Sequence, residues 1–232
     1  MKNIKALTLA FLLSLFSSSY ALAEYGLTVG VTGSMAMIDA SGTETEGGEN
    51  TRGEASNNTA VGSVFVEYNN ILGSGLSLGI DYIPGSADIS SSTEKRMDQE
   101  TSVTSTTTET TTSRTQKAQA ELENHLTYYA TYTADNGVYL KAGYVQVDLN
   151  TLESLGTGSK YGNDTLDGIA VGAGVEFDVG YDNMVGRLEL QHIDYGDIEL
   201  KSSVARTGVA TNNLIEADID VTMLSASLGY KF

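Results

Sequence analysis

The chain ends in the stretch Ser225-Ala226-Ser227-Leu228-Gly229-Tyr230-Lys231-Phe232, and the alternation in this stretch decides the fold. Counted back from Phe232, every second residue as far as Leu224 is apolar, and the residues between them are small or polar. Successive side chains of a β-strand point to opposite faces, so the pattern predicts a strand with one apolar and one polar face. The last apolar side chain of this strand belongs to the final residue.

The beginning of the chain has the pattern of an export signal. Lys2 and Lys5 precede an apolar run over 6–16, and Ala21-Leu22-Ala23 fits a small-x-small cleavage site. We therefore expect residues 1–23 to be a cleaved signal peptide and residues 24–232 to form one domain. A terminal strand that ends on an aromatic residue in an exported chain is typical of bacterial outer-membrane β-barrels. The resemblance implies that the β-barrel assembly machinery recognises this strand, and we expect Tyr230 and Phe232 to form the assembly signal.

Composition narrows the possible partners. The 232 residues carry a net charge of −17, and removal of the signal leaves 11 basic against 30 acidic residues, or −19. This charge argues against direct binding to nucleic acid or to anionic headgroups, but it suits an outer leaflet in which divalent cations bridge anionic groups. With no Cys there is neither a disulfide nor a lipoprotein anchor. The single proline, Pro84, is expected to close a strand.

Alternation with a period of two recurs in eight segments. They cover about 25–37, 60–68, 76–82, 126–133, 138–144, 169–177, 184–191 and 224–232. Tight turns at 69–74, 135–137 and 180–183 alternate with long polar connections at about 40–58, 85–124, 150–164 and 197–215. Short turns at one end and long loops at the other predict an all-β fold, an eight-stranded antiparallel up-and-down transmembrane β-barrel. The turns would lie in the periplasm and the loops outside, and closure would leave no strand edge in lipid.

The parity of the apolar residues fixes two hairpin registers. A three-residue loop at 135–137 keeps the parity between its two strands, and a two-residue turn at Tyr181-Asp182 reverses it. The predicted opposite pairs are Tyr128 with Tyr144, Thr131 with Lys141, and Glu176 with Arg187.

Two segments leave alternatives open. The Thr- and Ser-rich loop over 85–124 favours a continuation of its flanking strands as a hairpin above the membrane, although 117–123 could form a helical turn. Ile219 and Val221 are out of phase with the strand that follows, as Val145 and Val147 are with theirs. Either a bulge lies near Thr222 or this part of the barrel lies above the membrane.

Three motifs resemble one known family. The run Gly168-Ile169-Ala170-Val171-Gly172-Ala173-Gly174-Val175-Glu176-Phe177, followed by Arg187-Leu188-Glu189-Leu190 and Asp194-Tyr195-Gly196, resembles the OmpA-like, opacity-type small surface barrels. The resemblance is strongest over about 137–232 and implies an eight-stranded barrel. Because the chain stops at Phe232, we expect it to lack the peptidoglycan-binding domain of larger relatives.

Charged residues fall on the inward parity of the predicted strands. They are Glu67, Asp81, Lys141, Glu176, Arg187, Glu189 and Lys231. An eight-stranded barrel is just wide enough for side chains to fill it, so unpaired charges inside would be costly and pairing is expected. In the resembled family such residues form an ion-pair network that plugs the lumen. Carried over, this implies Arg187 with Glu176 or Glu189, and Lys141 with Glu67, as either a static plug or a switchable gate.

Catalytic and metal-binding patterns are weak. His192-Ile193-Asp194 lies where small lipid-A-deacylating barrels keep a His-x-Ser pair, but Asp replaces the nucleophilic Ser. His125 has no evident partner in the sequence. Acidic clusters at 44–54 and 194–199 could hold Ca²⁺ or Mg²⁺, but neither has the spacing of a dedicated cation loop, so we expect solvated surfaces and no cofactor.

Three function classes follow. The first is a monomeric structural or surface-interaction barrel with a plugged lumen, whose loops contact lipopolysaccharide, outer-membrane lipids, neighbouring cells or phage. The second is a small channel that prefers cations, because carboxylates outnumber basic groups on the inward parity. The third and most remote is an outer-membrane lipid-modifying enzyme.

Overall fold

The computed structural model describes residues 26–46, 48–69, 71–91, 94–105, 108–152, 160–203 and 212–232. These residues form a closed antiparallel barrel with the strand order β1-β10-β9-β8-β7-β6-β3-β2, together with a separate two-stranded sheet of β4 and β5. Among them there is no helix long and apolar enough to cross a membrane. Tyr25 and the expected signal peptide lie outside the described residues.

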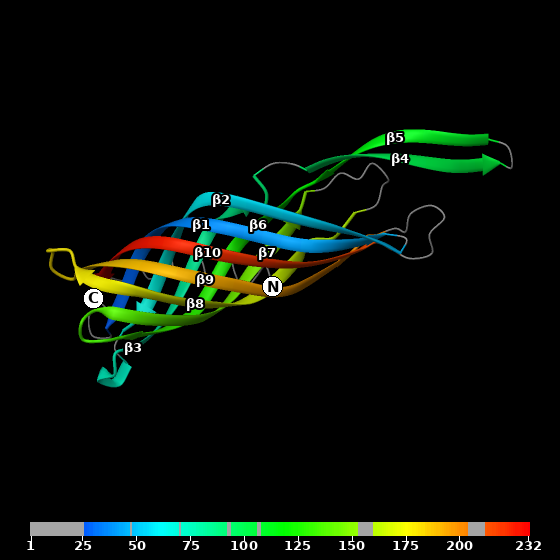
Figure 1. Cartoon of the computed structure of the whole chain (residues 1–232). Helices are drawn as coiled ribbons and strands as arrows, with labels where there is room; N and C mark the ends of the chain where they lie inside the picture. Colours follow the sequence, from blue (N-terminus) through cyan, green and yellow to red (C-terminus); the bar gives the residue numbers. More distant parts are fainter. Residues whose placement is uncertain are drawn as a thin grey trace.

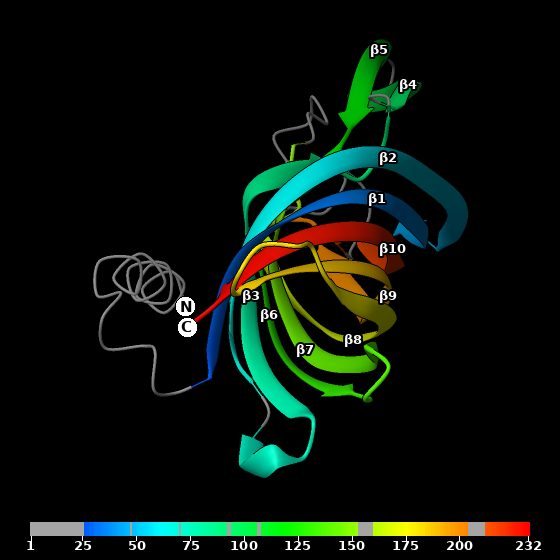
Figure 2. The same cartoon turned by 90° about the vertical axis from the view of Figure 1, so that its left-hand side faces the viewer.

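The ten strands differ in length, and most barrel strands are longer than the sequence pattern suggests. They are β1 (Leu27–Glu46), β2 (Glu49–Tyr68), β3 (Leu76–Asp88), β4 (Glu94–Ser105), β5 (Thr108–Ala118), β6 (Ala120–Thr133), β7 (Val138–Thr151), β8 (Asp164–Asp178), β9 (Met184–Lys201) and β10 (Leu214–Lys231). Short connections lie at one end of the barrel, the turn end, on the left of Figure 1. The β4–β5 hairpin lies beyond the other end, the loop end, where β1 and β2 also meet. Figure 2 shows the strands curving around a common axis.

The predicted hairpin registers are confirmed. Tyr128 lies opposite Tyr144 and Thr131 opposite Lys141 between β6 and β7, and Glu176 lies opposite Arg187 between β8 and β9. Gly137 adopts a φ of 83°, the left-handed conformation that the three-residue loop requires. Period-two parity and turn length are therefore sufficient to align neighbouring strands in this chain.

The outer face of the barrel carries a band of exposed apolar side chains. Its most exposed members include Leu140, Ile169, Leu190 and Leu224, as a surface in contact with lipid requires. Towards the loop end the outward side chain changes from apolar to polar within one two-residue step of the register. Met37 is followed by Asp39, Leu190 by His192, and Leu224 by Thr222, and Met37 pairs with Thr222. We call the part from the turn end to this level the membrane half, and the part beyond it the outer half.

The long polar connections are shorter than expected, because strand pairing continues beyond the membrane half. β1 and β2 pair as far as Glu46 and Glu49, so most of the expected loop at 40–58 is strand. The expected loop at 197–215 likewise shrinks, since β9 runs to Lys201 and β10 starts at Leu214. Backbone hydrogen bonding, which the apolar pattern does not report, sets these lengths.

The segment over 85–124 also forms strand. β3 and β6 pair as far as Asp88 and Glu121, and β4 and β5 then form a further hairpin. The hairpin continuation is therefore confirmed. The alternative of a helical turn over 117–123 is wrong, since β5 and β6 occupy that segment apart from Gln119.

Pro84 does not close its strand. It lies within β3, and the β2–β3 ladder ends two residues before it, at Val64 and Tyr82. The same register would place Gly62 opposite Pro84, which has no N–H to donate. The β3–β6 ladder has an irregularity at the same place, between Ile83 and Ser86. The proline therefore marks the level at which β3 separates from β2.

The phase slips in the sequence have a simple cause. Val145 and Val147 are fully buried, and Ile219 and Val221 nearly so, inside the outer half of the barrel. β10 keeps its register with β1 from Lys231 to Leu214 without a bulge. Its register with β9 shifts between Asp218 and Asp220, beyond Thr222. The strand therefore continues in phase, and the polarity of its two faces reverses at the edge of the membrane half.

Candidate functional site

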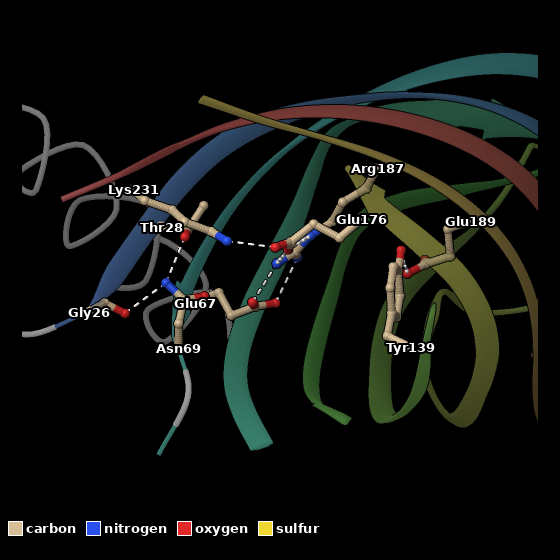
Figure 3. A network of polar contacts seen from close by, with 9 residues as sticks. All are labelled: Gly26, Thr28, Glu67, Asn69, Tyr139, Glu176, Arg187, Glu189 and Lys231. Carbon is tan, nitrogen blue, oxygen red and sulfur yellow. Dashed lines mark hydrogen bonds and ion pairs between the residues drawn. The ribbon is translucent and has the colours of Figure 1, made fainter. Parts of the chain in front are cut away.

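Four charged side chains close the lumen near the turn end. Arg187 donates two hydrogen bonds to Glu67, from Nη1 at 2.8 Å and from Nη2 at 2.6 Å. It donates two more to Glu176, from Nε at 2.9 Å and from Nη2 at 2.8 Å. Lys231 donates to the other oxygen of Glu176 at 2.5 Å. We call Glu67, Glu176, Arg187 and Lys231 the ion-pair layer (Figure 3).

The centre of this layer, Glu67 and Arg187, is buried, whereas the Lys231 side chain is 40% exposed. Glu67 is 1% exposed and Arg187 9% exposed. The Arg187 guanidinium carbon lies 5.5 Å from the centre of the Phe65 ring and 5.7 Å from that of Tyr139. Gly30 leaves the space for the Phe65 ring, since a Cβ there would lie 2.4 Å from it. A bidentate guanidinium held between aromatic rings has little freedom to leave its carboxylates.

A second charged pair lies elsewhere in the lumen. Lys141 Nζ donates to Glu189 at 2.8 Å, and the Tyr139 hydroxyl donates to the other oxygen of Glu189 at 2.9 Å. The ammonium of Lys141 also lies 4.6 Å from the centre of the Tyr129 ring. Glu189 is therefore paired without any contribution from Arg187.

The expected partners are partly wrong. Arg187 pairs with Glu176, as one expected alternative has it, but Glu189 pairs with Lys141, and Lys141 does not pair with Glu67. Glu67 lies near the end of β2, which β1 and β10 separate from β9, and it meets Arg187 across the lumen. The tilt and stagger of barrel strands decide such cross-lumen contacts, which the register between neighbouring strands does not reveal.

Between these charged groups and the loop end lies a polar cavity of about 40 Å³, which we call the chamber. Its walls carry hydroxyls that pair across strands, Thr32 with Ser227 at 2.9 Å and Ser34 with Ser225 at 2.7 Å. Asp81, the remaining charged residue of the expected set, lines the chamber and accepts a hydrogen bond from Ser63 at 2.8 Å.

Beyond the chamber the lumen is filled by apolar side chains, which we call the outer core. Its buried members are Ala36, Ile38, Ile83, Ile89, Leu122, Val145, Val147, Leu149, Leu166, Ala170, Ile193, Tyr195, Ile198, Ile219, Val221 and Met223. This cluster was not predicted from the sequence, although the phase slips at Val145, Val147, Ile219 and Val221 are its signal. The ion-pair layer and the outer core close the lumen at separate levels.

Hydrogen bonds tie the loop end together above the outer core. The Tyr161 hydroxyl donates to Glu44 at 2.6 Å, and the Asn213 amide donates to the same oxygen at 3.3 Å. Tyr161 also forms an isolated bridge with Ser202. These bonds connect β1 to the segments that flank β8, β9 and β10. Among the described residues no group of three or more His, Asp or Glu side chains is arranged to hold a metal ion.

The two histidines lie in different surroundings. His192 is half-exposed on the outer face, with Nδ1 3.2 Å from the Thr222 hydroxyl and Nε2 3.6 Å from Asp220. A catalytic triad instead uses a buried acid to orient its imidazole. His125 is buried in the lumen, and its ring lies edge-on to Tyr195 at 6.2 Å.

The geometry defines a class of protein: a small closed barrel with an apolar belt, a charged lumen and extended strands at its loop end. Residues 8–232 match the family of the outer membrane protein beta-barrel domain, and the chain belongs to that family. Its place is therefore the bacterial outer membrane. No curated protein matches the chain.

One solved structure supports the fold. The outer membrane protein OprG from Pseudomonas aeruginosa is similar, at 13% identity over 90% of this chain and 96% of that chain, with a TM-score of 0.55. Neisserial surface protein A is 14% identical over 86% of this chain and 97% of that chain, with a TM-score of 0.36. At these identities, the likeness to OprG concerns the fold alone.

Proposed function

We propose that this barrel acts through the strands and loops of its outer half, in a structural or surface-interaction role, and that its lumen is a permanent plug. The observation that carries the proposal is the double closure of the lumen. The ion-pair layer holds Arg187 by four hydrogen bonds, and the outer core fills the lumen at another level. A barrel closed twice offers its outside surface, rather than a passage, for function.

The extended strands support the same proposal. β1 and β2 pair over twenty residues each, well beyond the 9–11 residues that cross a bilayer. The β4–β5 hairpin adds a further two-stranded extension at the loop end (Figure 1). Long paired strands hold a surface away from the membrane, where lipopolysaccharide, neighbouring cells or phage would meet it. We also propose that residues 1–23 are a signal peptide, which directs export of the chain and is then cleaved.

The test replaces the hairpin over 94–118 by a short turn in cells that produce the protein. The probe is attachment of these cells to one another and to a monolayer of eukaryotic cells. We expect the shortened variant to lose the attachment that the full chain confers. A matched variant with a shortened turn at 71–73 should keep it. Equal attachment with and without the hairpin would contradict the role of β4 and β5.

A small cation-preferring channel is the second candidate. It is favoured by the chamber and by the excess of carboxylates over basic groups in the lumen. Conductance of the refolded chain in a planar bilayer separates it from the first. Lipid modification is the remote third candidate, and mass analysis of lipid A with and without the protein tests it.

The last strand has a proposed role in assembly. Phe232 donates its backbone N–H to Leu27 at 2.8 Å, and its ring lies 5.0 Å from that of Tyr230. The hydrogen bond joins the end of the chain to β1, beside the β1–β10 pairing. We expect deletion of Phe232 to lower the amount of folded protein in the membrane, measured against total protein. An unchanged folded fraction would argue against recognition of this residue by the assembly machinery.

A further inference from the structure

The chamber is the feature of the lumen that the plug does not explain. It has a volume of about 40 Å³ and lies between the charged pairs and the outer core. A water molecule needs roughly 10–15 Å³ by the same measure, so the chamber has room for about three or four water-sized particles. Its size therefore excludes an organic ligand but not a small ion with a water molecule.

The charges in the membrane half do not balance. Four carboxylates, Glu67, Asp81, Glu176 and Glu189, face three basic groups, Lys141, Arg187 and Lys231. All three basic groups are engaged with Glu67, Glu176 or Glu189. Asp81 accepts a hydrogen bond from Ser63, and within the described residues no basic side chain forms an ion pair with it. Lys141 lines the same cavity and attracts Asp81, but its ammonium is bonded to Glu189. Asp81 therefore has no counter-charge of its own, and such a charge in a lumen is costly.

A second observation points to a missing occupant. Thr131 lines the chamber and is 3% exposed, yet its hydroxyl has no hydrogen-bond partner. Buried polar atoms are nearly always satisfied, so an unsatisfied hydroxyl aimed into a polar cavity indicates something that fills the cavity. The other walls carry hydroxyl oxygens of Thr32, Ser34 and Ser225, and hard cations prefer oxygen ligands.

We propose that the chamber binds one small monovalent cation, of the size of Na⁺, beside the carboxylate of Asp81. One positive charge neutralises the lumen, whereas a divalent ion would leave it positive. A fully hydrated Mg²⁺ also keeps more water than the chamber can hold. The bound ion would stabilise the membrane half by neutralising Asp81. This proposal does not depend on the role of the outer loops.

One titratable neighbour could supply the charge in another way. His125 lines the same chamber, as do the charged groups Lys141, Arg187 and Glu189. A protonated imidazole would compensate Asp81 without an ion. The experiment is therefore run at pH 8, above the ordinary titration range of histidine. The same measurement at pH 5.5 distinguishes neutralisation of Asp81 by a proton from neutralisation by a metal cation.

The experiment uses the full mature chain refolded in an uncharged detergent. Its thermal midpoint is measured in rising NaCl, with choline chloride keeping the ionic strength constant. We expect a saturable rise of roughly 3–6 °C at ten times the dissociation constant. Asp81→Asn should abolish the rise, and in choline it should be at least as stable as the parent because the unpaired charge is gone. Asp39→Asn, on the outer face, should keep the full response.

Three results would overturn the proposal. The first is an equal response of the parent chain to Na⁺ and choline. The second is a Na⁺ response that survives in Asp81→Asn. The third is stabilisation by acid at pH 5.5 in choline with no effect of Na⁺ at pH 8, which would assign the missing charge to a proton. If Asp81→Asn does not fold, ²³Na line broadening by the parent chain, reduced by Ser63→Ala, tests the same site, and absence of broadening rejects it.

Discussion

The two halves of this barrel have opposite distributions of polar and apolar side chains between the outer face and the lumen. In the membrane half, apolar side chains such as Leu140 and Leu190 point outward, and Arg187 and its carboxylates point inward. In the outer half, acids such as Asp39 and Asp220 point outward, and Val147 and Ile193 are fully buried inside. The same strands supply both halves. The solvent around each half therefore decides which face is apolar, while the parity of each strand stays constant.

The difference also separates two ways of filling a narrow lumen. Buried apolar side chains fill the outer half, and their contribution is non-directional and grows with the apolar area removed from water. Charged side chains fill the membrane half by specific pairing, and each depends on its partner. Loss of a single group should therefore be more costly in the membrane half than in the outer half.

The largest effect is expected in the ion-pair layer. Arg187→Met leaves Glu67 buried without its partner and removes one partner of Glu176, so unfolding should become easier by about 3–5 kcal/mol. The measurement is urea unfolding in lipid vesicles. Adding Glu67→Met should restore most of the loss, since Lys231 still pairs with Glu176. A single variant as stable as the parent would show that the layer does not hold the barrel together.

The next effect is expected in the outer core. Ile193→Ala creates a cavity at a fully buried site, and the cost should be about 2–4 kcal/mol. The matched variant is Ile169→Ala on the neighbouring strand, where the side chain is 66% exposed on the lipid face. Lipid chains can fill the space there, so its cost should be a small fraction of the first. Equal costs for the two variants would contradict a packed outer core.

A smaller effect is expected where glycine makes room for an aromatic ring. A Cβ on Gly79 would lie 2.3 Å from the Tyr129 ring, so Gly79→Ala should displace the ring and cost about 1–3 kcal/mol. A Cβ on Gly33 would meet no neighbouring atom within 4 Å, and Gly33→Ala should therefore be neutral. The same urea unfolding assay compares the two variants. A loss of stability in Gly33→Ala but not in Gly79→Ala would contradict the role of Gly79 in making room for the ring.

The smallest effect is a pH dependence of the outer half. Desolvation, together with the hydrogen bond and charge of Asp197 opposite, raises the pKa of Asp218 above its ordinary value of 3.8. The folded state then holds this proton more tightly than the unfolded state, so its stabilising contribution is present at low pH. It is lost as pH rises from about 3.8 through the raised value. In a pH series of unfolding midpoints, Asp218→Asn should reduce the dependence of the midpoint on pH in this range. An unchanged dependence would mean that another group causes it.

Neighbouring strands could be aligned from the sequence, and contacts across the lumen could not. Turn length and parity place Glu176 opposite Arg187, because the period of a strand is fixed. The partner of Glu67 depends on strand tilt and stagger, which no local pattern encodes. The outer core was visible only as a phase slip at Val145 and Ile219, since the reversal of polarity at the edge of the lipid mimics a bulge.

The most direct test of the double closure is single-channel conductance of the refolded chain in a planar bilayer, beside an Arg187→Met variant shown to be folded and inserted. We predict silence from both, because the outer core closes the lumen even when the ion-pair layer is broken. Reproducible cation-selective steps in either protein would contradict the double closure. Steps that appear only in the variant would show that the ion-pair layer alone closes the lumen. The layer would then be a gate, and the channel function would be favoured.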